Sequence, residues 1–296
     1  MNINQARQEG QKLLAQSPTP VLDTDCILES VLKKDKTYIL FHRDDELTQE
    51  QQDSFFDGIK KRAKGLPVAY ITGHKEFYGI DFFVTPDVLI PKPDTEVLVE
   101  EAAGIIRAQL KNGGTVRVCD MCTGSGCIGT SVLKECLVPG LPAGTRLEFT
   151  LADISTAALD IAKKNVLNIL GKETFSKITF VRGDLFENIS GRFNVILSNP
   201  PYIPKALVPS LLADGRREPS LALDGDAAEK SSDGLGIVRR LVPQAASHLA
   251  PGGILLIETG EYNAQDAELV FKKEGFKDTR IIYDLSGMMR DVFGRI

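Results

Sequence analysis

The sequence predicts an α/β protein in which a mostly parallel, Rossmann-like sheet follows a small helical domain. Two patterns of apolar residues support this prediction. Residues 1–65 carry apolar side chains at helical spacing, whereas from Gly114 onward short apolar runs alternate with amphipathic stretches. Strands and helices that alternate in this way form a parallel sheet with helices on both faces, and such sheets bind ligands at the carboxyl ends of their strands.

The first region, residues 1–68, is expected to be a helical bundle. Its expected helices cover residues 4–14, 23–32 and 48–64. Thr48 followed three residues later by Gln51 is typical of a capping box, in which two side chains bond the free backbone groups at a helix start. Gly65 and Pro67 are expected to end the third helix.

The next region, residues 69–95, is expected to be a linker that contains a β-hairpin. Aromatic and β-branched residues gather on both sides of Gly79 within residues 76–84. This composition around a glycine is typical of two short antiparallel strands. Two prolines then interrupt the chain before the next element begins.

Residues 96–296 are expected to form the sheet domain. Asp94 or Thr95 can cap its first helix, which runs to about Gln109. Strands are expected at 116–120, 147–152, 178–181, 195–198 and 254–258, helices at 128–136, 155–170, 237–249 and 263–273, and a closing antiparallel pair at 279–283 and 291–293. The long segment 205–236 is a candidate for a lid that the substrate orders.

Composition narrows the classes of function. The formal net charge of −5 argues against a direct nucleic-acid binder. No apolar run is long enough to span a bilayer and residues 1–12 lack a signal-peptide pattern, so we expect a cytoplasmic protein without a membrane partner. Five cysteines without such a signal indicate reduced thiols. Cys119 and Cys122 have zinc-like spacing, but no second pair follows, so no metal is expected.

The first functional motif, residues 120–126, joins the first strand of the sheet domain to its first crossover helix. Its glycines let the backbone turn sharply and approach a ligand. Such a turn serves a dinucleotide, a phosphate or S-adenosylmethionine, or is a tight turn without a ligand; a P-loop is excluded because no Gly-Lys-Ser/Thr follows. The candidate cofactor contacts are Cys122, Thr123, Gly124, Ser125 and Gly126.

Two further candidates follow the next two strands. Asp153 can accept hydrogen bonds from both ribose hydroxyls of an adenosine, and it can also cap the helix that begins near Ser155. Asp184 can accept from the adenine amino group, while the backbone N–H and the side chain of Leu185 can meet the ring. Three such features at successive strand ends are more specific than any one of them.

The segment Ser198-Asn199-Pro200-Pro201-Tyr202 follows the fourth strand and is the candidate reacting loop. Its two prolines restrict the backbone and hold Asn199 in place. An amide or aromatic amine nitrogen is a poor nucleophile, and two acceptors that bind its N–H groups can orient it toward a methyl donor. The Asn199 side chain and the Pro200 carbonyl are suitable acceptors, and Tyr202 can stack on the planar group. These motifs predict methyl transfer from S-adenosylmethionine to a planar nitrogen, with Asn199, Pro200 and Tyr202 as catalytic residues and residues 199–202 as the substrate site.

A second set of motifs precedes and follows these loops. They are PVAYITG at 67–73, FYG at 77–79, VLIPKPDTE at 88–96, EP at 218–219, AL at 222–223, DGL at 233–235 and PGG at 251–253. Together with the Asn199 loop they resemble the HemK/PrmC family of glutamine N5-methyltransferases, and the resemblance covers nearly the whole chain.

The resemblance implies a seven-stranded class I S-adenosylmethionine-dependent methyltransferase domain and an N-terminal domain that holds a class I peptide chain release factor. It implies that the substrate is the glutamine of a Gly-Gly-Gln tripeptide, methylated at N5, and that S-adenosyl-L-homocysteine is the product. A monomer is expected. The alternative is an adenine-N6 DNA or guanine RNA methyltransferase that shares the Asn-Pro-Pro-Tyr loop. A non-catalytic binding protein and an NAD-dependent dehydrogenase are less well supported, because the reacting loop is intact and no hydride-transfer site is evident.

The chain departs from the family pattern at four positions. Lys92 stands where the family usually has Arg, which keeps the charge but loses the planar fork. Asp94 replaces a Glu, and Leu185 replaces an aromatic residue that is frequent in the family. Cys122 replaces a Gly, and from its side chain we expect the backbone there to avoid a positive φ.

Overall fold

The structure is a computed structural model that describes residues 1–227 and 231–296. The chain divides into two compact units, one formed by 1–74 with 210–217 and the other by 75–209 with 218–296. No helix in these described ranges is long and apolar enough to cross a membrane. The domain boundary expected at residue 68 therefore lies six residues earlier than the division between the two units, and the segment 210–217 groups with the first unit.

The first unit is helical, as predicted. Its helices are α1 (Ile3–Leu13), α2 (Pro20–Leu32), α3 (Lys36–Phe41), α4 (Gln49–Ala63) and α5 (Val68–Thr72). The capping box of Thr48 and Gln51 is confirmed. The two shortest helices, α3 and α5, were not expected, because fewer than two turns give no clear hydrophobic period.

The segment 210–217 makes close backbone contact within this unit. Gly65 has φ of +93°, and a Cβ built on it would lie 2.0 Å from the carbonyl oxygen of Asp214. A Cβ on Gly215 would lie 2.5 Å from the carbonyl oxygen of Lys64. Two glycines, one on each segment, are therefore required where these two stretches of chain meet.

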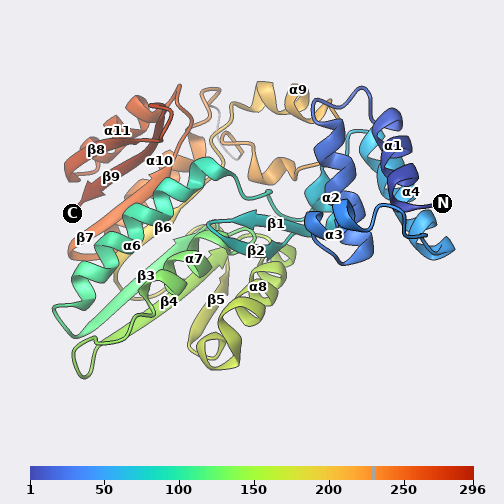
Figure 1. Cartoon of the computed structure of the whole chain (residues 1–296). Coiled ribbons are helices and arrows are strands. Elements are labelled where there is room, and N and C mark those ends of the chain that lie inside the picture. The colour runs from blue at the N-terminus through green and yellow to red at the C-terminus, as the bar shows by residue number, and fades with distance from the viewer. Residues whose placement is uncertain (228–230) are drawn as a thin grey trace. The chain divides into compact units, whose positions relative to one another are not determined.

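The second unit contains the sheet and the helices that cover it (Figure 1). The hairpin of β1 (His74–Phe77) and β2 (Ile80–Phe83) confirms the expected hairpin, and all of it except His74 belongs to this unit. The other strands are β3 (Thr115–Met121), β4 (Arg146–Asp153), β5 (Ile178–Arg182), β6 (Phe193–Ser198), β7 (Leu249–Glu258), β8 (Lys277–Tyr283) and β9 (Met289–Arg295). The main helices are α6 (Glu96–Leu110), α7 (Cys127–Cys136), α8 (Thr156–Phe175), α10 (Gly236–His248) and α11 (Ala264–Lys273).

The seven-stranded sheet has the order β5-β4-β3-β6-β7-β9-β8. The pairs β3–β4, β4–β5, β3–β6 and β6–β7 are parallel, and β9 is antiparallel to both of its neighbours. The predicted parallel sheet with a closing antiparallel pair is therefore confirmed. The strand order reverses at β3, which has β4 on one side and β6 on the other, so the carboxyl ends of these strands flank the switch point where such sheets bind ligands.

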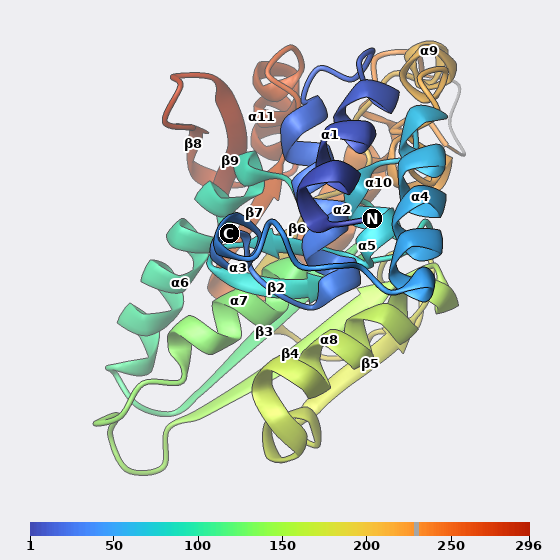
Figure 2. The same ribbon diagram turned by 45° about the vertical axis from the view of Figure 1, so that its right-hand side comes forward.

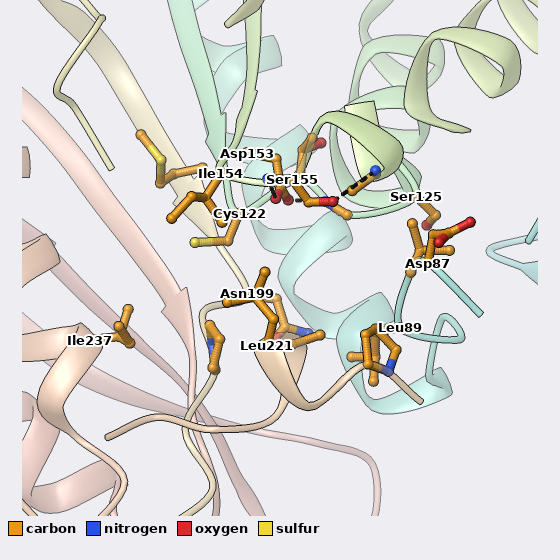
Figure 3. Close-up of a pocket in the computed structure, with 18 of the residues that line it drawn as sticks. Asp87, Leu89, Cys122, Ser125, Asp153, Ile154, Ser155, Asn199, Leu221 and Ile237 are labelled. Carbon is orange, nitrogen blue, oxygen red and sulfur yellow. Dashed lines mark hydrogen bonds between the residues drawn. The ribbon is translucent and has the colours of Figure 1, made fainter. Parts of the chain in front are cut away.

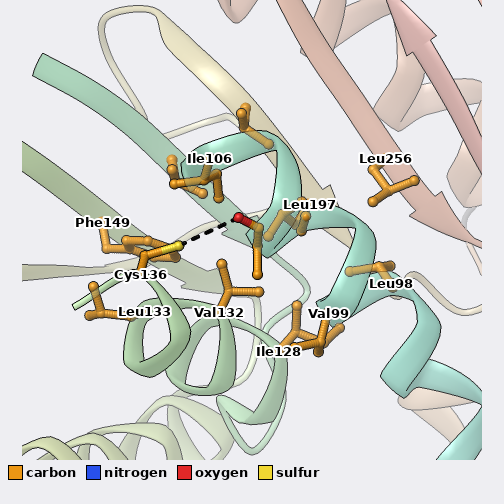
Figure 4. Packing of buried hydrophobic residues seen from close by; sticks show 14 of the residues in the cluster. Leu98, Val99, Ile106, Ile128, Val132, Leu133, Cys136, Phe149, Leu197 and Leu256 are labelled. Atoms are coloured by element: carbon orange, nitrogen blue, oxygen red, sulfur yellow. Dashed lines mark hydrogen bonds between the residues drawn. The ribbon is translucent and has the colours of Figure 1, made fainter. Parts of the chain in front are cut away.

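Side chains alternate along the central strands and build a hydrophobic core on each face of the sheet. Val118, Leu197 and Leu256 belong to the core under α6, α7 and α8, which Figure 4 shows from close by. Ile196 and Leu255 point to the opposite core, under α10 and α11. Figure 2 shows the two groups of helices on opposite sides of the sheet. The strands are held from both faces, so the loops at their ends start from fixed positions.

Asn165 on α8 joins the hairpin to the motif at 120–126. Its side chain is buried, with the amide oxygen accepting from the Phe83 N–H at 2.8 Å. The amide nitrogen donates to the carbonyl oxygens of Phe83 and Ser125, both at 2.9 Å. One side chain thus satisfies three backbone groups of two segments that are far apart in sequence.

We predict that Asn165→Ala lowers the free energy of unfolding by about 3 kcal/mol, because it leaves three buried backbone groups without a partner. Chemical denaturation followed by circular dichroism measures this change. Asn168→Ala is the matched control, since Asn168 lies on the same helix and is exposed; equal losses in both variants would contradict the role of Asn165.

Candidate active site

A cavity of about 500 Å³ opens at the carboxyl ends of β3, β4 and β6. Nine of the predicted site residues line it: Cys122, Thr123, Gly124, Ser125, Asp153, Asp184, Leu185, Asn199 and Pro201. Figure 3 shows Cys122, Asp153 and Asn199 around this space. Gly126, Pro200 and Tyr202 lie beside the cavity without forming its wall. Among the described residues, no group of three or more His, Cys, Asp or Glu side chains is arranged to hold a metal ion.

The motif at residues 120–126, called the cofactor loop from here on, adopts left-handed backbone conformations at three positions. Gly124 and Gly126 have φ of +55° and +77°. A Cβ on Gly126 would lie 3.1 Å from the Cβ of Ala162, so helix packing also requires a glycine there. Cys122 has φ of +59°. The expectation that Cys122 avoids a positive φ is therefore wrong: the loop keeps the turn that a glycine would make, and the cysteine bears the strain.

Asp120 holds this loop from beneath. The carboxyl is fully buried, and its Oδ2 accepts from the Thr123 hydroxyl at 2.5 Å and from the Gly129 N–H at 3.0 Å. Burial raises the pKa of Asp120 to about 7, although both hydrogen bonds act in the opposite direction. The loop therefore rests on a carboxyl group that water does not reach.

Asp153 links the ends of two strands to each other. Its Oδ2 accepts from the Gly124 N–H at 2.9 Å, and its Oδ1 accepts from the Ser155 N–H at 2.9 Å. The cap of α8 is Ser155, whose side chain accepts from the Ala158 N–H. Burial raises the pKa of Asp153, and its backbone hydrogen bonds oppose that rise. Each carboxylate oxygen has a further lone pair that can accept from a ligand hydroxyl.

Asp184 and Leu185, which follow β5, form another part of the cavity wall. Asp184 Oδ2 accepts from Arg240 Nη2 at 2.6 Å. The carboxylate that we expected to accept from the adenine amino group is therefore already bound by a side chain of α10. Leu185 has φ of +53° and is buried in the core under α10 and α11. Arg240 also lines the cavity. The sequence alone did not indicate Arg240, because its contribution depends on how α10 packs.

Asn199 follows β6 directly and is tied to the chain on two sides. The hydroxyl of the preceding Ser198 donates to the Met121 carbonyl at the end of β3, at 2.7 Å. The Asn199 amide nitrogen donates to the hydroxyl of Thr95 at 3.3 Å. Thr95 is buried at the start of α6, where it was predicted only as a helix cap. Its side chain makes no cap hydrogen bond and faces the reacting loop instead.

Glu258 ends β7 beneath the same loop and is fully buried. Its Oε1 accepts from the Tyr202 hydroxyl at 3.2 Å, and its Oε2 has no hydrogen-bond partner among the described residues. Burial raises the pKa of Glu258 to about 7. Burial likewise raises the pKa of Tyr202 far above its usual range. Glu258 was missed in the sequence, although it ends a predicted strand just as Asp153 does.

The backbone of Tyr202 is enclosed by the segment that follows it. Tyr202 O accepts from Asn263 Nδ2 at 3.0 Å and from the Tyr262 hydroxyl at 3.2 Å. A Cβ on Gly234 would lie 2.1 Å from that same carbonyl oxygen, and a Cβ on Gly225 would lie 2.8 Å from the Tyr202 Cα. Only glycines allow this approach. In the candidate lid, 205–236, the segments around these two glycines therefore pack tightly against Tyr202 of the reacting loop.

Two departures from the family pattern have partners in the structure. Lys92 Nζ lies 2.6 Å from Oε1 of Glu218, which is buried, and Lys92 lines the cavity. Asp94 Oδ2 lies 3.1 Å from Arg290 Nη2. Lysine and aspartate therefore still pair with opposite charges at these positions.

The chain matches two family models, a PrmC N-terminal domain over residues 5–73 and a methyltransferase small domain over residues 97–212. It is 35% identical over 274 residues to a release factor glutamine methyltransferase of Clostridium acetobutylicum, which covers 91% of this chain and 89% of that protein. A release factor glutamine methyltransferase of Coxiella burnetii is 33% identical over 299 residues, with 100% and 99% covered. A solved methyltransferase from Pyrococcus furiosus aligns with a TM-score of 0.49 and 16% identity, over 80% of this chain and 96% of that chain.

The sheet order, the glycine-rich turn after β3 and the methyltransferase model define the class of protein, which is an S-adenosylmethionine-dependent methyltransferase of class I fold. Within that class, the family is shown by relatives that are 33–35% identical to this chain over nearly its whole length. The chain belongs to the release factor glutamine methyltransferase family. The resemblance seen in the sequence is confirmed.

Asp120 gives a pH-dependent prediction. A folded-state pKa of about 7, against about 4 in the unfolded chain, means that the folded protein binds more protons in this window. The stability of the wild type therefore falls as pH rises from about 4 to about 7. Asp120→Asn keeps an acceptor for Thr123 and Gly129 without a titratable group, so its unfolding free energy relative to wild type should rise by on the order of 3 kcal/mol across the window.

Denaturant titrations of both proteins between pH 4 and pH 8 measure this difference. Glu258 ionises in the same window in both proteins, so its contribution cancels. A difference that stays constant with pH would show that Asp120 is not protonated in the folded state.

Proposed function

We propose that this protein transfers the methyl group of S-adenosyl-L-methionine to the side-chain amide nitrogen (N5) of the glutamine in the Gly-Gly-Gln motif of class I peptide chain release factors. The product would be S-adenosyl-L-homocysteine. The observation that carries the proposal is that Asn199 and the cofactor loop line the same cavity. A nucleophile bound at Asn199 and a methyl donor bound on the loop would therefore lie next to each other. The names of the relatives support a release factor as substrate.

The cavity fits the proposed methyl donor. Its volume suits a nucleoside-sized ligand. Asp153 offers acceptor lone pairs for ribose hydroxyls, and Gly124 offers backbone without a Cβ beside the ligand. The residues that would hold the donor are Cys122, Thr123, Gly124, Ser125, Gly126, Asp153, Asp184, Leu185 and Asn199. When bound, S-adenosylmethionine supplies an electrophilic methyl group on its sulfonium.

Asn199 and Pro200 would act on the nucleophile. The amide oxygen of Asn199 and the carbonyl of Pro200 would accept the two N–H groups of the glutamine amide and hold its nitrogen toward the donor. The same two acceptors would stabilise the positive charge that develops on nitrogen during transfer. Pro201 and Tyr202 would complete the substrate site. No strong base is required, because the proton leaves after the nitrogen has been alkylated.

Release-factor binding would fall in part to residues 1–68. The match of residues 5–73 to the PrmC N-terminal domain supports this assignment. The net charge of −5 gives no support to the alternative, an adenine or guanine methyltransferase that would need a basic groove.

We expect Asn199→Ala to reduce kcat by about 100-fold or more while the dissociation constant of the cofactor changes little, since two contacts made in the transition state are lost or misdirected. Single-turnover assays with labelled cofactor and calorimetric titration measure the two quantities. Wild-type turnover in this variant would show that Asn199 does not act on the nucleophile.

The nature of the substrate is tested with labelled S-adenosylmethionine on a release factor, on its Gly-Gly-Gln variant with Gln→Ala, and on DNA and RNA. We expect label only in the unchanged release factor, because the variant has no side-chain amide nitrogen to alkylate. Label that persists in the Gln→Ala variant would rule out the glutamine, and label in nucleic acid alone would favour the alternative.

A further inference from the structure

We propose that Arg240 is a positioning residue that makes the Asp184 carboxylate selective for adenine. This role rests on the proposed methyl donor, whose base carries an amino group at position 6. Asp184 was expected to accept from that amino group, and the structure shows that Arg240 already binds Asp184. The two roles are compatible, because a carboxylate has two oxygens and Arg240 takes one of them.

The base of the donor would lie between the end of β5 and α10. Asp153 ends β4 and is proposed to bind the ribose, and β5 is a parallel neighbour of β4. The Gly183 N–H donates to the Asp153 carbonyl oxygen at 3.2 Å, so the turn that carries Asp184 starts directly beside the proposed ribose site. Leu185 and Ile237 also line the cavity, and they would present apolar surface to the faces of a planar ring.

Two side chains of α10 hold the turn after β5, and they hold it at different points. Gln244 lies one helical turn beyond Arg240, and its Oε1 accepts from the Phe186 N–H at 3.3 Å. Phe186 is buried in the core under α10 and α11. The backbone of this turn is therefore anchored by Gln244 and the core. Arg240 instead binds the carboxylate of Asp184, and both of these residues line the cavity.

The ion pair between Arg240 and Asp184 occupies one carboxylate oxygen and leaves the other for a ligand. Arg240 Nη2 lies 2.6 Å from Asp184 Oδ2. The side chains of Arg240 and Asp184 are 27% and 43% exposed, as expected for a pair at the wall of an open space. The guanidinium only donates, so it binds Oδ2 and sets the rotation of the carboxylate. Oδ1 would then accept from an amino group at position 6 and repel a carbonyl oxygen there.

The same geometry determines what an amide would do at position 184. In Asp184→Asn, Arg240 would bind the side-chain oxygen, because a guanidinium has no acceptor. The amide nitrogen would then face the base and donate to it. Asp184→Asn should therefore reverse the preference and favour a base with a carbonyl at position 6. Without Arg240 the amide is free to turn over, so the double variant of Asp184→Asn with Arg240→Met should lose this reversal.

The experiment measures, by calorimetry, the dissociation constants of S-adenosyl-L-homocysteine and of its 6-oxo analogue, S-inosyl-L-homocysteine. We expect the wild type to bind the adenine form at least about 10-fold more tightly, as for one hydrogen bond to a charged group. Arg240→Met removes the donor but keeps much of the side-chain length, so it should lose most of this preference. Arg240→Lys keeps a charged donor and should retain most of it.

Gln244→Met is the matched control. It removes the other contact from α10 to the turn, and Gln244 does not belong to the cavity wall formed by the described residues. The base preference should therefore stay at the wild-type level in Gln244→Met, even if the protein is less stable.

Full preference in Arg240→Met would overturn the proposal, and so would an equal loss in Gln244→Met, since the effect would then be a general distortion of the turn. If Arg240→Met fails to fold, Arg240→Lys and Asp184→Asn carry the test, and an Asp184→Asn protein that still prefers adenine would overturn the proposal. A wild type that binds neither ligand nor S-adenosylmethionine would overturn the proposed function together with this inference. A wild type that binds both ligands equally would overturn this inference alone.

Discussion

The parallel pairing of β3, β6 and β7 is the constraint on which the rest of the site depends. In-register pairing brings Met121, Ser198 and Ile257 to the same level of the sheet. The residues that continue these strands then enter one space: the cofactor loop after Met121, Asn199 after Ser198 and Glu258 after Ile257. Helices cover both faces, so none of these strand ends can move independently.

This placement explains why so many carboxyl groups are buried here. Asp120 lies on β3, Glu258 and Asp291 face each other on the adjacent strands β7 and β9, and all three are nearly inaccessible. Burying a charged group without a full set of partners destabilises a protein. Asp120 accepts a hydrogen bond from Thr123 of the cofactor loop, and Glu258 accepts one from Tyr202 of the reacting loop. In these two cases the buried carboxyl lowers the stability of the fold but fixes the position of a loop. For Asp291 the structure offers no comparable partner among the described residues.

The elements and the loops could be predicted because both depend on local patterns. Strand and helix periods placed every long element within a few residues, and polar residues at strand ends marked Asp153, Asp184 and Asn199. Thr95 and Arg240 could not be recognised in this way, since their importance depends on how α6 and α10 pack. The conformation of Cys122 was predicted wrongly for a related reason: local preference disfavours a positive φ, but hydrogen bonds around Thr123 and Gly124 impose it.

The glycine contact between Gly65 and Asp214 has a consequence for synthesis on the ribosome. The helical unit includes 210–217 as well as 1–74, so its last segment emerges more than a hundred residues after the rest. Chains usually fold domain by domain as they leave the ribosome. Here the helices near the N-terminus can collapse early, but the unit is complete only after most of the sheet unit has been made. The order of translation therefore couples the folding of the two units, and cutting the chain between them would leave one unit without a part of itself.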